Sequence, residues 1–193
     1  MAGLVLCGGH SVRFGRDKAL WTVGGEPLVV RAARRLSEVT DPVLLASGTP
    51  GQLGPNLGWL EVADELPDAV SDAGPLAGLA AGLASSPHDL MAAVAVDMPF
   101  ASPTLLRLLA DLHRSEDAVV PVTARGREPL HAVYATSALP AIRRALAEGR
   151  FALRSMLDGL SVREVREDEW RMADAGGRFA INLNRAEDAA ALE

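Results

Sequence analysis

The chain has 193 residues, of which 49% are hydrophobic and 23% charged, and its 25 acidic and 19 basic side chains give a net charge of −6. This composition is that of a globular protein rather than a disordered one, and the length suits one large domain or at most two small ones. A net negative charge disfavours general binding to nucleic acid. It does not exclude a local basic pocket for a phosphorylated small molecule.

Cysteine content and hydropathy indicate the compartment. Cys7 is the only cysteine, so no intrachain disulfide can form, as suits a reducing environment. No apolar stretch reaches the roughly 20 residues that cross a bilayer, and the apolar N-terminal run is too short for a signal peptide. We therefore expect a cytoplasmic protein that makes no membrane contact.

Short apolar runs alternate with amphipathic stretches through the first half of the chain. The runs at 3–7, 43–46 and 91–96 predict buried strands, whereas 27–36 and 74–84 predict helices. A third helix should begin at Pro103 with Ser102 as its cap. Strands that alternate with helices through short links predict a mostly parallel sheet with helices on both faces.

The second half is less regular. Strands are predicted at 118–122 and 132–135, on either side of a polar turn at 125–128, and also at 162–165 and 179–183. Helices are predicted at 138–148, at 152–158 and from Arg185 onward. Because no repeat or low-complexity linker divides the chain, we expect one Rossmann-like α/β domain over residues 1–193.

A glycine-rich loop follows the first predicted strand, from Leu6 to Lys18. Glycines let backbone N–H groups approach phosphate oxygens, and ligands of open α/β sheets bind beyond the carboxyl ends of the strands. Arg13 and Lys18 add positive charge there, and Lys18 is the only lysine among the 19 basic residues. These features predict a site for a phosphorylated ligand.

Three better-known motifs do not fit this loop. Gly15 is followed by Arg16-Asp17-Lys18, which is not the Gly-Lys-Ser/Thr ending of a Walker A loop. The spacing of Gly8, Gly9 and Gly15 differs from the dinucleotide fingerprint Gly-x-Gly-x-x-Gly. No Gly-x-Ser-x-Gly elbow is present, so the loop serine is a poor candidate for a hydrolase nucleophile.

The loop resembles Leu-x-Gly-Gly-x-Ser-x-Arg-Met/Phe-Gly-x-Asp-Lys, the signature of the nucleotidyltransferases that make sugar nucleotides and cofactor dinucleotides. The closest resemblance, over nearly the whole chain, is to the molybdenum cofactor guanylyltransferase family. The further segments that carry it are Gly24–Leu28, Asp72–Gly78, Val96–Phe100, Pro129–Tyr134 and Ile181–Asp188.

The resemblance implies a role for each matching position. Binding of the nucleotide falls to the loop residues Leu6, Cys7, Gly8, Gly9 and Lys18, with Asp64 on the base or ribose side and Asp97 touching both nucleotide and Mg²⁺. Arg13, Lys18 and Asp97 form the implied catalytic group, and Asn182 and Asn184 lie on the acceptor side. One departure stands at Ala46-Ser47, where many relatives have an asparagine that contacts the nucleotide.

The implied reaction transfers GMP from GTP to the terminal phosphate of molybdenum-loaded molybdopterin and releases pyrophosphate. The nucleophile is already anionic, so the demand falls on positioning and on stabilisation of charge, as Mg²⁺ and cationic side chains provide. The N-terminal half would bind the nucleotide and the C-terminal half the acceptor. Transient contacts with other proteins of cofactor biosynthesis or with apo-molybdoenzymes are also compatible with this reading.

Other interpretations stay open at this point. Lys18 could be a surface cation at a helix start, Asp97 could cap a turn, and Asp64 could belong to a polar loop. The same fold could transfer a cytidylyl group to molybdopterin or a nucleotidyl group to a sugar-1-phosphate. An accessory protein that binds nucleotide without turnover is a third alternative, for which loss of Lys18 or Asp97 would be expected, and both are present.

Overall fold

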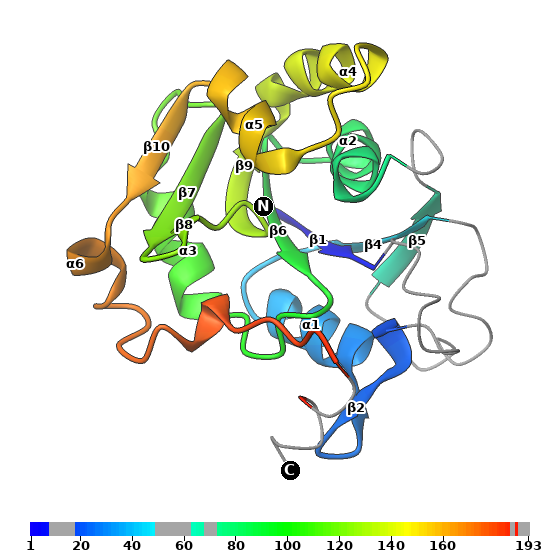
Figure 1. Ribbon diagram of the computed structural model, residues 1–193, viewed down its shortest axis with the longest axis vertical. Helices are drawn as coiled ribbons and strands as arrows, with labels where there is room; N and C mark the ends of the chain where they lie inside the picture. The colour runs from blue at the N-terminus through cyan, green and yellow to red at the C-terminus, as the bar shows by residue number, and fades with distance from the viewer. Residues whose placement is uncertain (8–17, 49–62, 68–72, 186–187, 189–193) are drawn as a thin grey trace.

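The computed structural model describes residues 1–7, 18–48, 63–67, 73–185 and 188, with residues 48 and 63–67 described by their backbone alone. Within these ranges the chain folds around one large mixed sheet (Figure 1), and a two-stranded hairpin of β2 (Thr22–Val23) and β3 (Glu26–Pro27) stands apart from it. None of the helices described there is long and apolar enough to span a membrane.

The large sheet has the strand order β10-β7-β9-β6-β1-β4-β5, and a short strand β8 pairs with β7. Its strands are β1 (Ala2–Leu6), β4 (Val43–Gly48), β5 (Ala63–Pro67), β6 (Leu90–Ala95), β7 (Ala118–Thr123), β8 (Gly126–Arg127), β9 (His131–Ala135) and β10 (Val162–Val165). β1 is central and buried along its whole length, which explains why its residues form an unbroken apolar run.

The direction of β9 sets the geometry of the site. β1 pairs in parallel with β4 and β6, β4 with β5, and β10 with β7. β9 is antiparallel to both of its neighbours, β6 and β7. The first residues of β9 therefore lie at the edge of the sheet where the parallel strands end.

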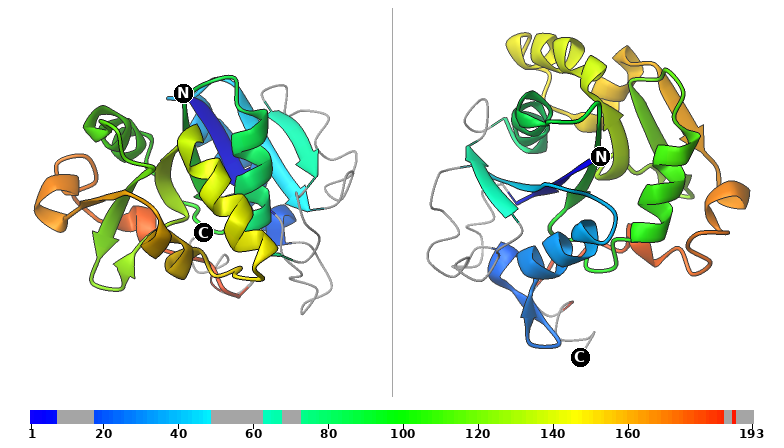
Figure 2. Two further views of the ribbon diagram at one scale, coloured as in Figure 1. Left: turned by 90° about the horizontal axis from the view of Figure 1, so that it is seen from above. Right: turned by 180° about the vertical axis from the view of Figure 1, so that it is seen from behind.

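Helices cover both faces of the sheet (Figures 1 and 2), as the sequence predicts. α1 (Leu28–Ser37) and α3 (Pro103–Leu112) pack on one face, and α2 (Pro75–Ser85), α4 (Leu139–Ala147) and α5 (Leu153–Met156) on the other. α6 (Glu167–Trp170) lies beside β7. Alternate residues of β1 serve the two cores: Val5 packs with α1 and α3, and Leu4 and Leu6 pack with α2.

Several local predictions are confirmed. α3 begins at Pro103, and the Ser102 hydroxyl accepts a hydrogen bond from the Leu105 N–H at 3.3 Å. α2 begins at Pro75, and its small residues leave it buried on most sides. The predicted helix at 152–158 is present as α5 followed by the 3₁₀ turn Leu157–Gly159.

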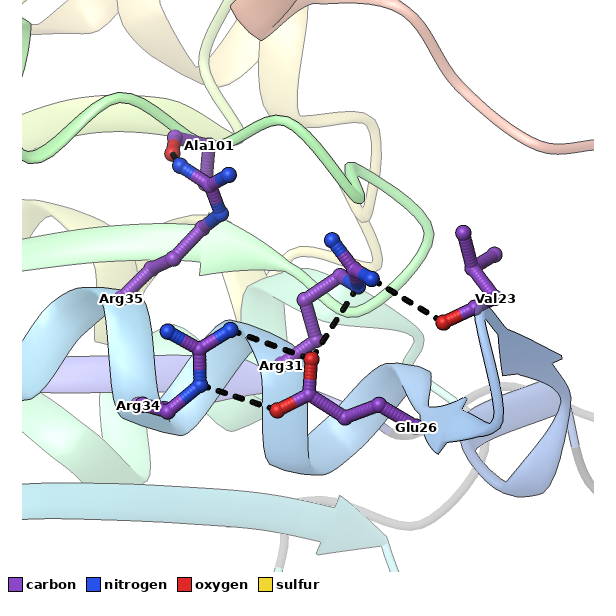
Figure 3. A network of polar contacts seen from close by, with 6 residues as sticks. All are labelled: Val23, Glu26, Arg31, Arg34, Arg35 and Ala101. Atoms are coloured by element: carbon purple, nitrogen blue, oxygen red, sulfur yellow. Dashed lines mark hydrogen bonds and ion pairs between the residues drawn. The ribbon is translucent and has the colours of Figure 1, made fainter. Parts of the chain in front are cut away.

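A polar network fixes α1 to the hairpin before it and to the loop after β6 (Figure 3). Glu26 accepts two hydrogen bonds from Arg34, at 2.9 and 3.1 Å, and these bonds lower the pKa of the Glu26 carboxyl. Arg31 donates to a backbone carbonyl of β2, and Arg35 donates to the carbonyl of Ala101 at 3.1 Å. The bond from Arg35 to Ala101 thereby ties the loop that follows β6 to α1.

One strand prediction is wrong, and four short strands, β2, β3, β5 and β8, were not predicted. Residues 179–183 do not join the sheet, because Phe179 and Ala180 belong to a 3₁₀ turn (Arg178–Ala180) and the N–H of Leu183 donates to the carbonyl of Asp97. Phe179 packs instead against the rings of His131 and Trp170. Among the unpredicted strands, β5 has a polar sequence and runs beside β4 at the sheet edge. The helix predicted from Arg185 falls mostly outside the described residues.

Candidate active site

Lys18 and Asp97 meet at the carboxyl end of the central strands. The Lys18 Nζ donates a hydrogen bond to Asp97 Oδ2 at 2.8 Å, and the two side chains are 15% and 24% exposed. Lys18 begins the 3₁₀ turn Lys18–Leu20 at the far end of the predicted phosphate loop, and Asp97 follows β6. The structure thus brings together two residues that the sequence assigns to phosphate and to metal.

The turn that carries Asp97 is fixed by its backbone. The N–H of Val96 donates to the carbonyl of Leu6 at 3.1 Å, which extends the pairing of β6 with β1. The N–H of Met98 donates to the carbonyl of Ala95, and the Met98 side chain is buried. Asp97 therefore stands at a rigid strand end with its side chain partly open to solvent.

The C-terminal segment lies against this turn. The N–H of Leu183 donates to the carbonyl of Asp97 at 2.9 Å, so Asn182 and Asn184 flank a direct contact with the site. The N–H groups of Asn184 and Arg185 both donate to Asp188 Oδ2, and these two bonds lower the pKa of the Asp188 carboxyl. Asn184 is exposed, whereas the side-chain oxygen of Asn182 is buried and has no hydrogen-bond partner in the structure.

A pocket of about 330 Å³ opens next to Asp97. Its walls come from the start of α2, the turn after β6, the segment before β9, α5 with the residue before it, and the C-terminal segment. The lining residues are Pro75, Met98, Glu128, Pro129, Leu130, Ala152, Leu153, Arg154 and Asn182. The pocket joins Asn182, predicted on the acceptor side, to the direct neighbour of Asp97.

Glu128, which the sequence predicts only as part of a polar turn, also lines this pocket. Its polar turn suggests a solvated side chain, yet Glu128 is only 5% exposed. Its Oε1 accepts a hydrogen bond from the Thr123 hydroxyl at 2.8 Å and lies 3.6 Å from Arg125 Nε. A signal was present: Glu128 directly precedes an apolar run that becomes a buried strand.

The nucleotide side is only partly described. The carbonyl of Leu6 accepts from Val96, and the N–H of Cys7 donates to the carbonyl of Ala46 at 2.8 Å, so both residues anchor the strand from which the loop departs. Ser47 is fully buried in β4. Asp64 pairs with Leu44 through the backbone of β5. Gly8, Gly9 and Arg13 lie outside the described residues, and the nucleotide contacts of this whole group stay predictions.

The described residues offer a metal few ligands. Among them, no three His, Cys, Asp or Glu side chains gather into a metal-binding group. The hydrogen bond from Lys18 goes to Asp97 Oδ2, and within the same ranges no hydrogen bond reaches Asp97 Oδ1. Mg²⁺ commonly uses one or two carboxylates together with substrate phosphates and water, so a single strand-end aspartate fits this ion.

Comparison with known proteins bears on the family. The model of the MobA-like NTP transferase domain matches residues 3–166. "Probable molybdenum cofactor guanylyltransferase" from Pelotomaculum thermopropionicum is 33% identical over 187 residues, covering 96% of this chain and 88% of that protein. "Molybdenum cofactor guanylyltransferase" from Desulfosudis oleivorans is 31% identical over 190 residues, covering 97% and 92%.

A solved structure agrees with these relatives. The crystal structure of molybdopterin-guanine dinucleotide biosynthesis protein A from Archaeoglobus fulgidus superposes with a TM-score of 0.85 at 26% identity and covers 100% of this chain and 97% of that one. The predicted α/β fold and the predicted nucleotidyltransferase family are both confirmed. By its sequence, its fold and the matched segment that contains Lys18 and Asp97, this chain belongs to the MobA-like NTP transferase family.

Proposed function

We propose that this chain transfers GMP from GTP to the terminal phosphate of molybdenum-loaded molybdopterin, which yields a guanine dinucleotide cofactor and pyrophosphate. The observation that carries the proposal is the Lys18–Asp97 pair at a strand end beside a pocket lined by Asn182, in a chain that is similar to guanylyltransferases of the molybdenum cofactor.

The bond changes are those of a nucleotidyl transfer. An oxygen of the acceptor phosphate bonds to the α-phosphorus of GTP, and the bond from that phosphorus to the pyrophosphate oxygen breaks. The leaving pyrophosphate takes the electron pair, and no proton has to be removed from the anionic nucleophile. The barrier arises from bringing two anions together and from charge that builds on the leaving group.

Lys18 supplies the positive charge that this barrier requires. Its ammonium is a compact charge with three donors on a flexible stem, so it can leave Asp97 Oδ2 and turn toward phosphate oxygens. In the same proposal, Arg13 assists from the loop, and Leu6, Cys7, Gly8 and Gly9 contribute to binding of the nucleotide. Asp64 lies on the base or ribose side.

Asp97 is the residue that would hold Mg²⁺. A carboxylate with one unengaged oxygen, at the rigid end of a central strand, suits an ion that also takes phosphate ligands. When bound, the ion would neutralise phosphate charge and orient the triphosphate. Asp97 and Lys18 would then separate, one toward the cation and one toward the phosphates.

The pocket is the proposed seat of the acceptor. Asn182 lines it and Asn184 lies two residues further along the segment that contacts Asp97. In this proposal the nucleotide binds to the N-terminal half of the domain and the acceptor mostly to the C-terminal half. Transient exchange of the acceptor with other proteins of cofactor biosynthesis belongs to the same proposal.

A panel of nucleoside triphosphates with molybdenum-loaded molybdopterin and Mg²⁺ tests this function, with pyrophosphate release as the readout. We expect release with GTP and little with CTP or UTP. Preference for CTP would replace guanylyl by cytidylyl transfer, and turnover with a sugar-1-phosphate would replace the acceptor. A melting temperature raised by GTP without pyrophosphate release would indicate a binding protein instead.

A further inference from the structure

We infer that the buried Glu128 carboxylate recognises the acceptor by pairing with the adjacent ring N–H and amino groups of its pterin. The inference rests on the proposed function for the identity of the acceptor. Its own basis is the pocket that contains Met98, the residue after Asp97, where the Glu128 carboxylate stands in a wall made mostly of apolar residues, with Asn182 and Arg154 as the other polar residues.

Topology puts Glu128 at the correct end of the sheet. Because β9 runs against β6, the residues that precede β9 lie where β6 ends. The N–H of Ala95 donates to the carbonyl of Leu130 at 2.9 Å, and Ala95 is two residues before Asp97. A ligand that fills the pocket can therefore place one end beside Asp97 and another beside Glu128.

The carboxylate of Glu128 is only half engaged. Its hydrogen bond from Thr123 goes to Oε1, which also lies 3.6 Å from Arg125 Nε. Oε2 accepts no hydrogen bond within the ranges that the structure describes. A buried carboxylate normally has partners for both oxygens, so the unengaged oxygen of a pocket residue indicates a place for a donor from a ligand.

Asn182 also lines the pocket, and its side-chain oxygen is buried behind the wall without a partner. The carboxylate of Glu128 calls for a ligand edge that carries donors, which a phosphate does not have. The apolar walls from Met98, Leu130 and Leu153 suit the faces of a flat ring.

A 2-amino-4-oxopyrimidine edge has this combination, because its N–H and amino donors lie side by side and match the two oxygens of a carboxylate. Pterin and guanine share that edge. The pocket favours pterin, because Asn182 and the residues before β9 line it, whereas Leu6 and Asp64, which the proposal assigns to the nucleotide, belong to β1 and β5 on the other side of β6.

The first experiment compares Glu128→Gln with Glu164→Gln. Glutamine keeps the acceptor for Thr123 but sets an NH₂ donor against the donors of the ring. Glu164 is a matched control, since it pairs with Arg127 at 2.7 Å and does not line the pocket. We expect Glu128→Gln to raise the KM for molybdopterin about 10-fold or more and to leave the KM for GTP unchanged. Glu164→Gln should leave both unchanged.

A second measurement needs no variant. Wild-type protein is titrated with free pterin and with lumazine, in which a ring carbonyl replaces the 2-amino group. We expect pterin to bind about 10-fold more tightly or better, since lumazine sets an acceptor against a carboxylate oxygen. Equal binding of the two, or an unchanged molybdopterin KM in Glu128→Gln, would overturn the inference.

A third outcome would assign the carboxylate to guanine. If Glu128→Gln raised the KM for GTP instead, and abolished discrimination between GTP and ITP, the inference would be wrong. The proposed function fails separately. It falls if wild-type protein releases no pyrophosphate from any triphosphate, while a preference for pterin that depends on Glu128 would still support the recognition.

Discussion

Lys18 Nζ lies 2.8 Å from Asp97 Oδ2, although the two residues are 79 positions apart in the chain. One comes from the end of the glycine-rich loop and the other from the end of β6. Both side chains are partly buried, so each charge compensates for the water that the other has lost. A triphosphate with its metal offers new partners of the right sign to both at once, and we expect this pair to open when substrate binds.

Replacing Lys18 tests its role at the phosphates. We expect Lys18→Ala to lower turnover by about 10²-fold or more, the usual effect of losing a group that stabilises transition-state charge. Pyrophosphate release under saturating GTP and acceptor measures it. Arg34→Ala is the control, because Arg34 is an exposed cation on α1 that pairs with Glu26 away from the site. Similar rates for Lys18→Ala and Arg34→Ala would refute the assignment.

Asp97→Asn tests the metal assignment. Asparagine keeps the size of the side chain and can still accept from Lys18, but it loses the negative charge that a divalent cation requires. We expect Mg²⁺-dependent activity to disappear while the circular dichroism spectrum stays that of the folded protein. Asp158→Asn removes an exposed carboxylate that pairs with Arg127 and should keep full activity. Activity of Asp97→Asn with an unaltered Mg²⁺ dependence would rule out this residue as the ligand.

Most of the fold could be predicted from the sequence, because apolar runs and caps act locally. β1 and β6 are recognisable as buried strands, and Ser102 with Pro103 marks the start of α3. β5 was missed because a strand at the sheet edge can carry the polar residues of Ala63–Pro67. The direction of β9 also could not be predicted, since residue pattern does not encode which neighbours a strand finds.

The site, like the fold, could be predicted from the sequence only in part. Lys18 and Asp97 could be placed at one end of the sheet, because loops after parallel strands share that edge. Their direct contact depends on how two distant segments pack. The segment 179–183 alternates like a strand, but Phe179 is drawn into the core beside His131 and Trp170. The polar turn at 125–128 does not predict the burial of Glu128, because that burial depends on segments remote in sequence.

Buried His131 should make the stability of the fold depend on pH. Burial lowers the pKa of His131 from 6.5 to about 3. Its ring packs on Phe179, and its Nε2 accepts from the Ser102 N–H, so the folded protein holds it neutral. Between these two pKa values the unfolded chain binds more protons, so the free energy of unfolding falls as pH falls below 6.5. At pH 4.5 the loss should be about 2–3 kcal/mol.

Urea unfolding from pH 7.5 to pH 4.5 measures this effect. His131→Gln should be less stable at pH 7.5 but should lose less stability on acidification than the wild type. His88→Gln removes an exposed histidine and should leave the pH dependence as it is. A wild-type slope retained in His131→Gln would show that other groups cause it.

Gly82 should not tolerate even a methyl group. A Cβ at this position of α2 would lie 2.6 Å from Leu4 Cδ2 and 3.1 Å from Met91 Sδ, both in the buried sheet. We expect Gly82→Ala to lower the free energy of unfolding by about 1–3 kcal/mol through overpacking, less the roughly 1 kcal/mol that alanine gains in a helix. Gly159→Ala, where nothing lies within 4 Å, should change it by about 0.5 kcal/mol or less. Thermal or urea denaturation measures both variants, and equal free energies of unfolding for Gly82→Ala and Gly159→Ala would contradict this packing.

Because β9 runs antiparallel to its neighbours, the proposed donor side and acceptor side of this domain are built from different segments of the chain. Residues that contact the donor nucleotide would come from segments that follow forward strands, whereas Glu128 and its neighbours come from the stretch that leads into the backward one. Changes in that stretch leave the forward strands and their loops intact. A lineage could thus acquire a new acceptor while it keeps its old donor, by altering a few residues between β8 and β9.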